Sequence, residues 1–183
     1  MRKVIAATNI TLDGVYDHTE GVADGEIHQH YAELLDSADM ILYGRITYQL
    51  MQYWQTMLKE PSGEKTADDF ATSIDRVTKI IFSNTVKMTN WNSAKLATKP
   101  LEEVVRELKQ QSGKDILVGS RSLIMQLMNL NLIDEYQICI QPVIAGKGSA
   151  LFDNVQERAL LKLTKTKIFA NGAIILYYKP KEK

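Results

Sequence analysis

The order of apolar segments along the chain constrains the fold more than any other feature of the sequence. Short runs of apolar and β-branched residues, typical of buried strands, alternate with segments whose apolar residues recur at helical spacing. This alternation predicts a parallel sheet with helices packed on its faces, because parallel strands need a crossover connection between them. The four strands expected in this part of the chain are residues 4–10, 40–43, 76–83 and 116–118.

Helical spacing of apolar residues predicts the elements that separate these strands. Asp24 can cap the first helix, Pro100 fits the first position of the helix before the fourth strand, and Ser120 can cap the helix after it. The stretch 59–65, with a proline and a glycine, predicts an exposed loop. The expected helices cover residues 27–38, 46–57, 68–75, 101–108 and 123–128.

The last third of the chain has a different pattern. Residues 136–143, 159–169 and 173–179 resemble strands, and no long helix fits between the last two. Asn171-Gly172 between two strands is a strong signal for a tight hairpin turn. We therefore expect an antiparallel hairpin to close one edge of the sheet.

Composition narrows the class of protein. A chain of 183 residues with 45% apolar residues fits a single domain, 1–183, with a real core. Lys plus Arg equals Asp plus Glu at 22 each, which argues against nucleic acid as the main partner. Cys139 is the only cysteine, which favours a reducing compartment. Without a signal-peptide or membrane-span pattern, we expect a cytoplasmic protein that does not act on membranes.

The second expected strand ends at a turn suited to an anion. Gly44 leads directly into a helix start, where unpaired backbone N–H groups and the helix dipole favour negative charge. Arg45 adds a forked positive charge and Thr47 adds a hydroxyl. The alternative is an ordinary strand–helix turn in which Gly44 only relieves backbone strain.

A second glycine turn follows the fourth expected strand. Gly119 also leads into a helix start and is followed by an arginine. Because ligands in such sheets bind beyond the carboxyl ends of the parallel strands, the two turns predict two anion sites on one edge, a layout that suits a dinucleotide. The residues expected at this edge are Ala6, Ala7, Asp13, Gly44, Arg45, Thr47, Ser83, Asn84, Gly119, Ser120, Arg121 and Ser122.

Other motifs have simpler interpretations. His28 and His30 are two residues apart on a helix and point to different sides, so a shared metal is not expected, and no other cluster has metal-ligand spacing. Cys139 alternates with isoleucines and is interpreted as a packing residue. Gly146-Lys147-Gly148 predicts a loop with positive φ angles that could border the cleft.

These segments together resemble the dihydrofolate reductase-like family. Within it the chain is most similar to single-domain bacterial proteins that resemble the reductase domain of the bifunctional riboflavin biosynthesis protein. The likeness spans nearly the whole chain, and its last segment is the most specific. It is carried by residues 5–7 with 11–14, by 44–48, by 116–120, and by 132–135 together with 142–152.

The resemblance implies a dihydrofolate reductase-like three-layer α/β/α fold, with a mostly parallel central sheet and a C-terminal antiparallel hairpin. It also implies NADPH as hydride donor and a homodimer. By carry-over, the phosphates would meet Gly44, Arg45 and Thr47, and the adenosine end would meet Ser83 and Asn84. The pyrophosphate would meet Gly119, Ser120, Arg121 and Ser122, and the nicotinamide would meet Ala6 and Ala7.

The implied activity is an NADPH-dependent reductase acting on a small, heterocyclic, pterin- or pyrimidine-like substrate. Asp13 is the first candidate for the proton donor, and His28 is the second. The alternative is a non-catalytic nucleotide-binding or sensing protein of the same fold. It depends on His28, which stands where dihydrofolate reductases carry an acid. Val118 and Ser120 also replace a glutamate and a glycine that are usual in the riboflavin reductases.

Overall fold

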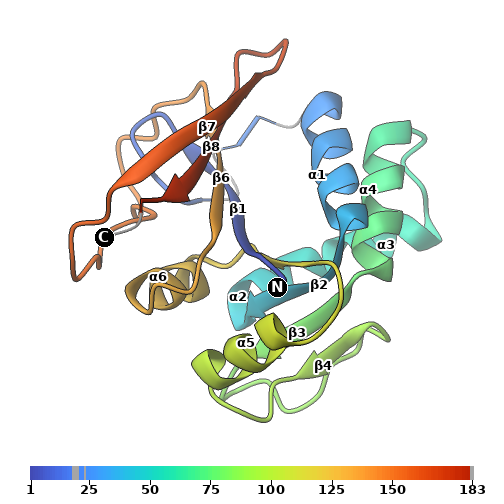
Figure 1. Ribbon diagram of the computed structural model, residues 1–183. Coiled ribbons are helices and arrows are strands. Elements are labelled where there is room, and N and C mark those ends of the chain that lie inside the picture. The colour runs from blue at the N-terminus through green and yellow to red at the C-terminus, as the bar shows by residue number, and fades with distance from the viewer. Residues whose placement is uncertain (18–20, 23, 182–183) are drawn as a thin grey trace.

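The computed structural model describes residues 1–17, 21–22 and 24–181. In this part of the chain the centre is one sheet with the strand order β4-β3-β2-β5-β1-β6-β8-β7 (Figure 1). The strands are β1 Val4–Thr11, β2 Ala38–Gly44, β3 Thr78–Phe82, β4 Ala94–Leu96, β5 Asp115–Val118, β6 Glu135–Gln141, β7 Leu161–Ile168 and β8 Ile174–Pro180.

From β4 through β3, β2, β5 and β1 to β6, each strand pairs parallel with the next. Strand β8 then pairs antiparallel with β6, and β7 pairs antiparallel with β8. The turn between β7 and β8 is closed by the Phe169 N–H, which donates to the Ala173 carbonyl at 2.9 Å, and Gly172 adopts φ 88°. The expected mostly parallel sheet with a C-terminal hairpin is confirmed.

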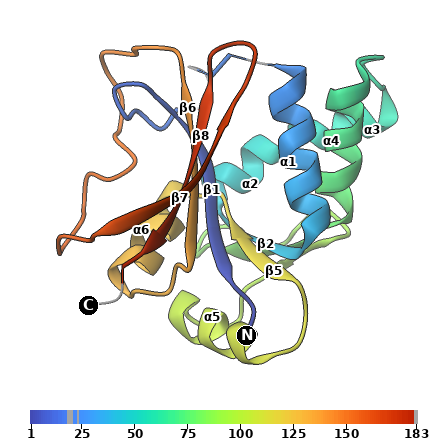
Figure 2. The ribbon, with the colours of Figure 1, turned by 45° about the horizontal axis from the view of Figure 1, so that its top comes forward.

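Helices cover both faces of the parallel part of the sheet (Figure 2). The first group lies on the face where Leu35, Ile41 and Ile74 form one core cluster, and the second lies on the face where Leu42, Val105 and Leu127 form another. These three layers match the expected α/β/α arrangement. The first group is α1 Gly25–Ser37, α2 Arg45–Met51, α3 Tyr53–Lys59 and α4 Lys65–Arg76, and the second is α5 Leu101–Gln110 and α6 Arg121–Asn129.

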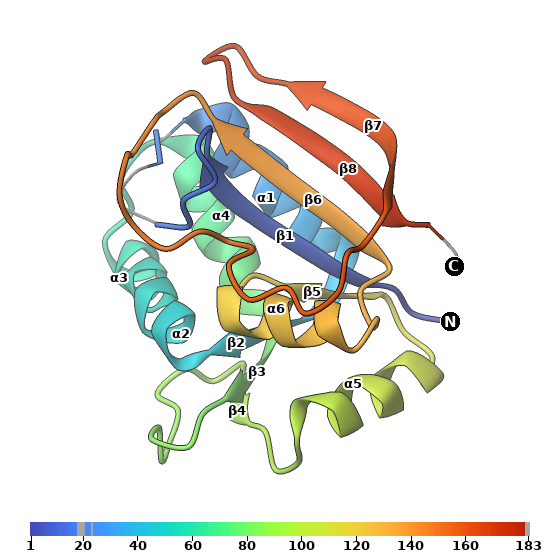
Figure 3. The same cartoon turned by 90° about the vertical axis from the view of Figure 1, so that its left-hand side faces the viewer.

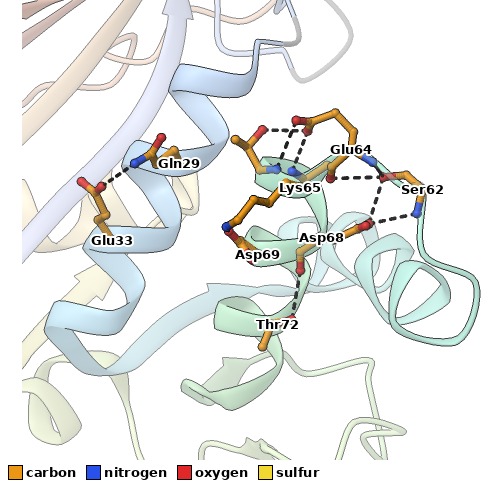
Figure 4. A network of polar contacts seen from close by, with 10 residues as sticks. Gln29, Glu33, Ser62, Glu64, Lys65, Asp68, Asp69 and Thr72 are labelled. Atoms are coloured by element: carbon orange, nitrogen blue, oxygen red, sulfur yellow. Dashed lines mark hydrogen bonds and ion pairs between the residues drawn. The ribbon is translucent and has the colours of Figure 1, made fainter.

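Three elements differ from the expectation. The helix expected over residues 46–57 is divided at Gln52, whose side-chain amide donates to Asn90 in the loop after β3. Helix α4 begins earlier than expected, because the Glu64 carboxylate accepts from the N–H groups of Thr66 and Ala67 (Figure 4). Strand β4 has only three residues and no strand pattern, and it forms only because it pairs with β3.

The C-terminal half of the sheet has less cover. Viewed from the side that faces α6, strands β6, β8 and β7 lie side by side, and no helix lies over β7 or β8 (Figure 3). Leu163 and Ile168 on β7 are 47% and 72% exposed. Among the residues that the structure describes, no helix is long and apolar enough to cross a bilayer.

Candidate functional site

A cavity of about 1040 Å³ opens at the carboxyl ends of β1, β2, β3 and β5 and continues beneath α1. Ligand pockets in proteins usually measure roughly 300–1,000 Å³, so this one has room for a dinucleotide and a ring beside it. Most of the residues expected at this edge of the sheet line it. They are Ala7, Gly44, Arg45, Thr47, Ser83, Asn84, Gly119, Ser120, Arg121 and Ser122.

At the first turn, Gly44 precedes α2 with φ −80°, which any residue can adopt. The need for glycine is therefore not backbone strain but space, because a Cβ here would lie 3.3 Å from Ser122 Oγ. No side chain caps α2, so the N–H groups of its first turn face the cavity without a side-chain partner. Arg45 is exposed, and within the described part of the chain its guanidinium donates to Gln49 alone, at 3.2 Å.

The second turn is joined to the first by Ser120. This residue occupies the N-cap position of α6, yet its hydroxyl makes no capping bond and instead accepts from the Gly44 N–H at 2.8 Å. The capping role expected for Ser120 is therefore wrong, because the neighbouring turn competes for the hydroxyl. The Gly119 carbonyl accepts from the Tyr16 hydroxyl at 2.7 Å, which ties the loop after β1 to the same turn.

Arg121 has a different role from Arg45. Its Nε donates to the Ala150 carbonyl at 2.8 Å, and its Nη2 forms an ion pair with Asp153. Both partners belong to the segment after β6, so the arginine fastens that segment over the second turn. Much of its hydrogen-bonding capacity is used within the protein.

Ala6 and Ala7 on β1 lie in different surroundings. Successive side chains of a strand point to opposite faces of a sheet. Ala7 lines the cavity, whereas Ala6 is fully buried in the core cluster on the α5–α6 face. The structure thus brings only one of the two residues into the site.

Asp13 lies outside the cavity lining, in the turn after β1. Its carboxylate accepts from the Thr11 hydroxyl and from the N–H groups of Ala145 and Gly146 at 3.1 and 2.8 Å. These bonds favour the ionised form and lower the pKa of Asp13 to about 2. The loop that it holds has positive φ at Gly146 and Gly148, as expected, and reaches the cavity through Ser149.

His28 also lies outside the lining. Its ring packs edge-on against Trp54 at 5.4 Å between ring centres and near Phe70 at 6.0 Å. Burial among these rings lowers the pKa of His28, with Glu64 and Asp24 opposing the shift. The structure therefore places the ring in the contact between α1, α3 and α4.

Cys139 is fully buried, and burial raises the pKa of its thiol to about 12, which matches the packing role expected for it. Among the described residues, no group of three or more histidine, cysteine or acidic side chains could hold a metal ion.

Sequence reasoning missed two parts of the lining. Thr98 and Lys99 enter after β4, a strand with no sequence signal. Asn9 and Tyr31 enter from β1 and α1, and the Tyr31 hydroxyl donates to Asn9 Oδ1 at 3.0 Å. The signal available for Asn9 was an amide side chain near the carboxyl end of a mostly apolar strand.

Comparison with known proteins agrees with this architecture. A family model described as the RibD C-terminal domain matches residues 2–176. The chain belongs to this family. It is similar to the uncharacterized protein YyaP of Bacillus subtilis (strain 168), with 33% identity over 181 residues, covering 97% of this chain and 94% of that protein.

Two solved structures share the fold. A pyrimidine reductase-like protein from Corynebacterium diphtheriae has a TM-score of 0.67 at 16% identity, covering 100% of this chain and 93% of that one. A diaminohydroxyphosphoribosylaminopyrimidine deaminase/5-amino-6-(5-phosphoribosylamino)uracil reductase from Thermotoga maritima has a TM-score of 0.64 at 17% identity. That alignment covers 98% of this chain and 57% of the bifunctional protein. At these identities the likeness shows the fold alone.

Proposed function

We propose that this protein is an NADPH-dependent reductase that transfers hydride to a small cyclic substrate. The single observation that carries the proposal is the shared cavity of the two glycine turns, which lies on the edge of the sheet where such folds bind ligands. Membership of the RibD C-terminal domain family supports it, as does the fold shared with proteins named as reductases.

The residues of the cavity fit a phosphorylated dinucleotide. Arg45 is exposed at the start of α2, and most of its donors have no partner among the residues that the structure describes; Thr47 and the uncapped first turn lie beside it. Such groups bind phosphate by charge-assisted hydrogen bonds. We propose that Arg45 and Thr47 hold the phosphate that distinguishes NADPH from NADH, that Ser83 and Asn84 lie at the adenosine end, and that residues 119–122 contact the pyrophosphate.

Ala7 has a distinct part in this proposal. Its side chain is a single methyl group in the cavity lining on β1, so a planar ring could lie close against the strand there. Bound NADPH would supply the hydride, and the protein would hold the ring and the acceptor face to face away from water. Asp13 and His28 remain untested predictions for the proton donor, and neither lines the cavity.

The test is titration of the purified protein with NADPH, followed by nicotinamide fluorescence, and then addition of pterins, flavin precursors and quinones. We expect saturable binding and loss of nicotinamide absorbance with at least one acceptor. Binding without turnover across the panel would support the sensor alternative, and absence of binding would refute both.

We also propose a homodimer. On the side of the sheet that faces α6, no helix lies over β7 and β8 (Figure 3), and β7 carries the exposed apolar side chains of Leu163 and Ile168. Light scattering after size-exclusion chromatography should give twice the mass of the chain, and Ile168→Glu should shift the protein toward the monomer. A monomeric wild-type protein would refute the proposal.

A further inference from the structure

The cavity has two chemically different parts. One part holds the glycine turns and the cations Arg45, Lys99 and Arg121. We term acceptor compartment the part of the cavity lining contributed by α1, α4, the end of α2 and Asn9 of β1, which is apolar except for Asn9 and the Tyr31 hydroxyl. It is lined by Asn9, Tyr31, Leu34, Leu35, Leu50, Met51, Phe70 and Ile74.

The cations of the cavity have hydrogen-bond or ion-pair partners outside the acceptor compartment. Lys99 pairs with Glu103 and Glu107 on α5, and Arg121 pairs with Asp153. The Arg45 guanidinium contacts Gln49 on its own helix. None of these partners lies on α1 or α4, and no lysine or arginine among the described residues lines the acceptor compartment.

Two polar side chains lie at one wall of the acceptor compartment. Asn9 Oδ1 accepts from the Tyr31 hydroxyl at 3.0 Å and from Gln141 Nε2 at 3.4 Å. These two bonds fix the amide and leave Asn9 Nδ2 without a partner among the described residues. Asn9 is exposed, so it offers a neutral N–H donor at the solvent-exposed edge of the compartment, which suits one carbonyl or ring nitrogen at the edge of a flat molecule.

Among the described residues, the Tyr31 hydroxyl is the one ionisable group that lines the compartment. Tyr31 is hydrogen-bonded and its burial raises its pKa well above the usual value, and burial raises the pKa of the nearby Tyr43 as well. The carboxylate that the cavity lining contains, Asp17, is exposed and belongs to the loop after β1. An acceptor that needs no protein acid would be one whose reduced form spreads the added charge over its own oxygens or nitrogens.

We infer that the acceptor compartment takes an uncharged, flat, electron-poor ring of the quinone or flavin-ring type, rather than a phosphorylated heterocycle. The inference rests on the proposed function. In the reaction the acceptor gains two electrons and one proton as hydride from the dihydronicotinamide, which becomes NADP⁺, and it takes its second proton from water. A phosphate in this compartment would lose its hydration without meeting a cation, which is strongly unfavourable.

The test compares naphthoquinone with its ring-sulfonated derivative, because the charge of the second compound cannot leave the ring. With NADPH under anaerobic conditions, we expect kcat/KM for the sulfonate to be lower by about tenfold or more, which corresponds to about 1.4 kcal/mol. Equal or faster reduction of the sulfonate would overturn the inference. So would a phosphorylated pyrimidine that is reduced faster than the uncharged quinone.

A binding measurement without NADPH separates this inference from the proposed function. Trp54 packs on Phe70 with 4.6 Å between ring centres, so its fluorescence reports on the compartment. We expect the uncharged quinone to quench it at concentrations at which the sulfonate does not. If NADPH fails to bind, the proposed function fails, while this quenching still decides the inference.

A matched pair of variants tests the role of charge directly. Leu34→Lys adds a cation to the acceptor compartment, and we expect it to raise the relative kcat/KM and binding of the sulfonate by about tenfold. Leu58→Lys makes the same change at an exposed position of α3 outside the cavity, and it should leave the ratio unaltered. An equal change in both variants would overturn the inference. Circular dichroism checks that both variants fold.

Discussion

The two glycine turns occupy matching positions in the fold, yet their arginines make different contacts. Each follows a parallel strand, begins a helix that has no side-chain cap, and is followed by an arginine. Among the described residues Arg45 of the first turn has one acceptor, Gln49, whereas Arg121 of the second turn is bound to Ala150 and Asp153. The arginine of the first turn is therefore available to bind a ligand, whereas the arginine of the second turn holds the segment after β6 in place.

The comparison teaches that a matching motif identifies a position in the fold and not a role. Whether an arginine is available depends on the segment that passes over it. At the second turn that segment is the loop after β6, and at the first turn no segment of the described chain reaches the guanidinium.

The largest expected effect is on cofactor affinity. Arg45→Ala should raise the Kd for NADPH by about ten- to a hundredfold, because a charge-assisted hydrogen bond contributes roughly 1.5–3 kcal/mol. The Kd for NADH should change by less than about threefold. Fluorescence titration measures both. Arg106→Ala on α5, which removes an exposed arginine outside the cavity, is the control. Equal losses for the two cofactors would contradict a contact with the extra phosphate.

Ser120 connects the two turns, and its removal should cost stability. In Ser120→Ala the buried Gly44 N–H loses its acceptor, which costs about 1–3 kcal/mol of unfolding free energy. Urea denaturation measures the loss. Ser122→Ala, at an exposed serine of the same turn, should stay within about 0.5 kcal/mol of the wild type. Similar stabilities for the two variants would show that the bond between the turns contributes little.

Arg121→Ala sharpens the contrast with Arg45. We expect a loss of about 1 kcal/mol in unfolding free energy, because the ion pair with Asp153 is partly exposed. Its effect on the Kd for NADPH should be smaller than that of Arg45→Ala. A double-mutant cycle with Asp153→Ala isolates the pair. If Arg121→Ala weakens NADPH binding more than Arg45→Ala does, the roles assigned to the two arginines are reversed.

The smallest expected effect is the difference in stability between alanine substitutions at the two glycines. A Cβ at Gly44 would meet Ser122 Oγ at 3.3 Å, whereas a Cβ at Gly119 would meet Tyr43 Cε1 at an ordinary 3.5 Å. Thermal denaturation should therefore show Gly44→Ala to be less stable than Gly119→Ala by a few tenths of a kcal/mol, in the range of small changes at helix caps. The reverse order would mean that Tyr43 is the less adaptable neighbour.

Much of the fold could be predicted because its signals are local. The apolar spacing of α1 and its Asp24 cap, the strand predicted at residues 4–10 and the Asn171-Gly172 turn all follow from neighbouring residues. The division at Gln52 and strand β4 could not be predicted in this way, because both depend on partners distant in sequence.

The features of the candidate site also separate into those that follow from local sequence and those that depend on distant contacts. The sequence by itself determined which turns end the parallel strands, since the strand–helix order and the two glycines are written in adjacent residues. Only the tertiary structure decided that Ala7 and not Ala6 reaches the cavity, that Asp13 and His28 stay outside it, and which arginine is free. Those outcomes depend on contacts between segments far apart in the chain, and local patterns do not encode them.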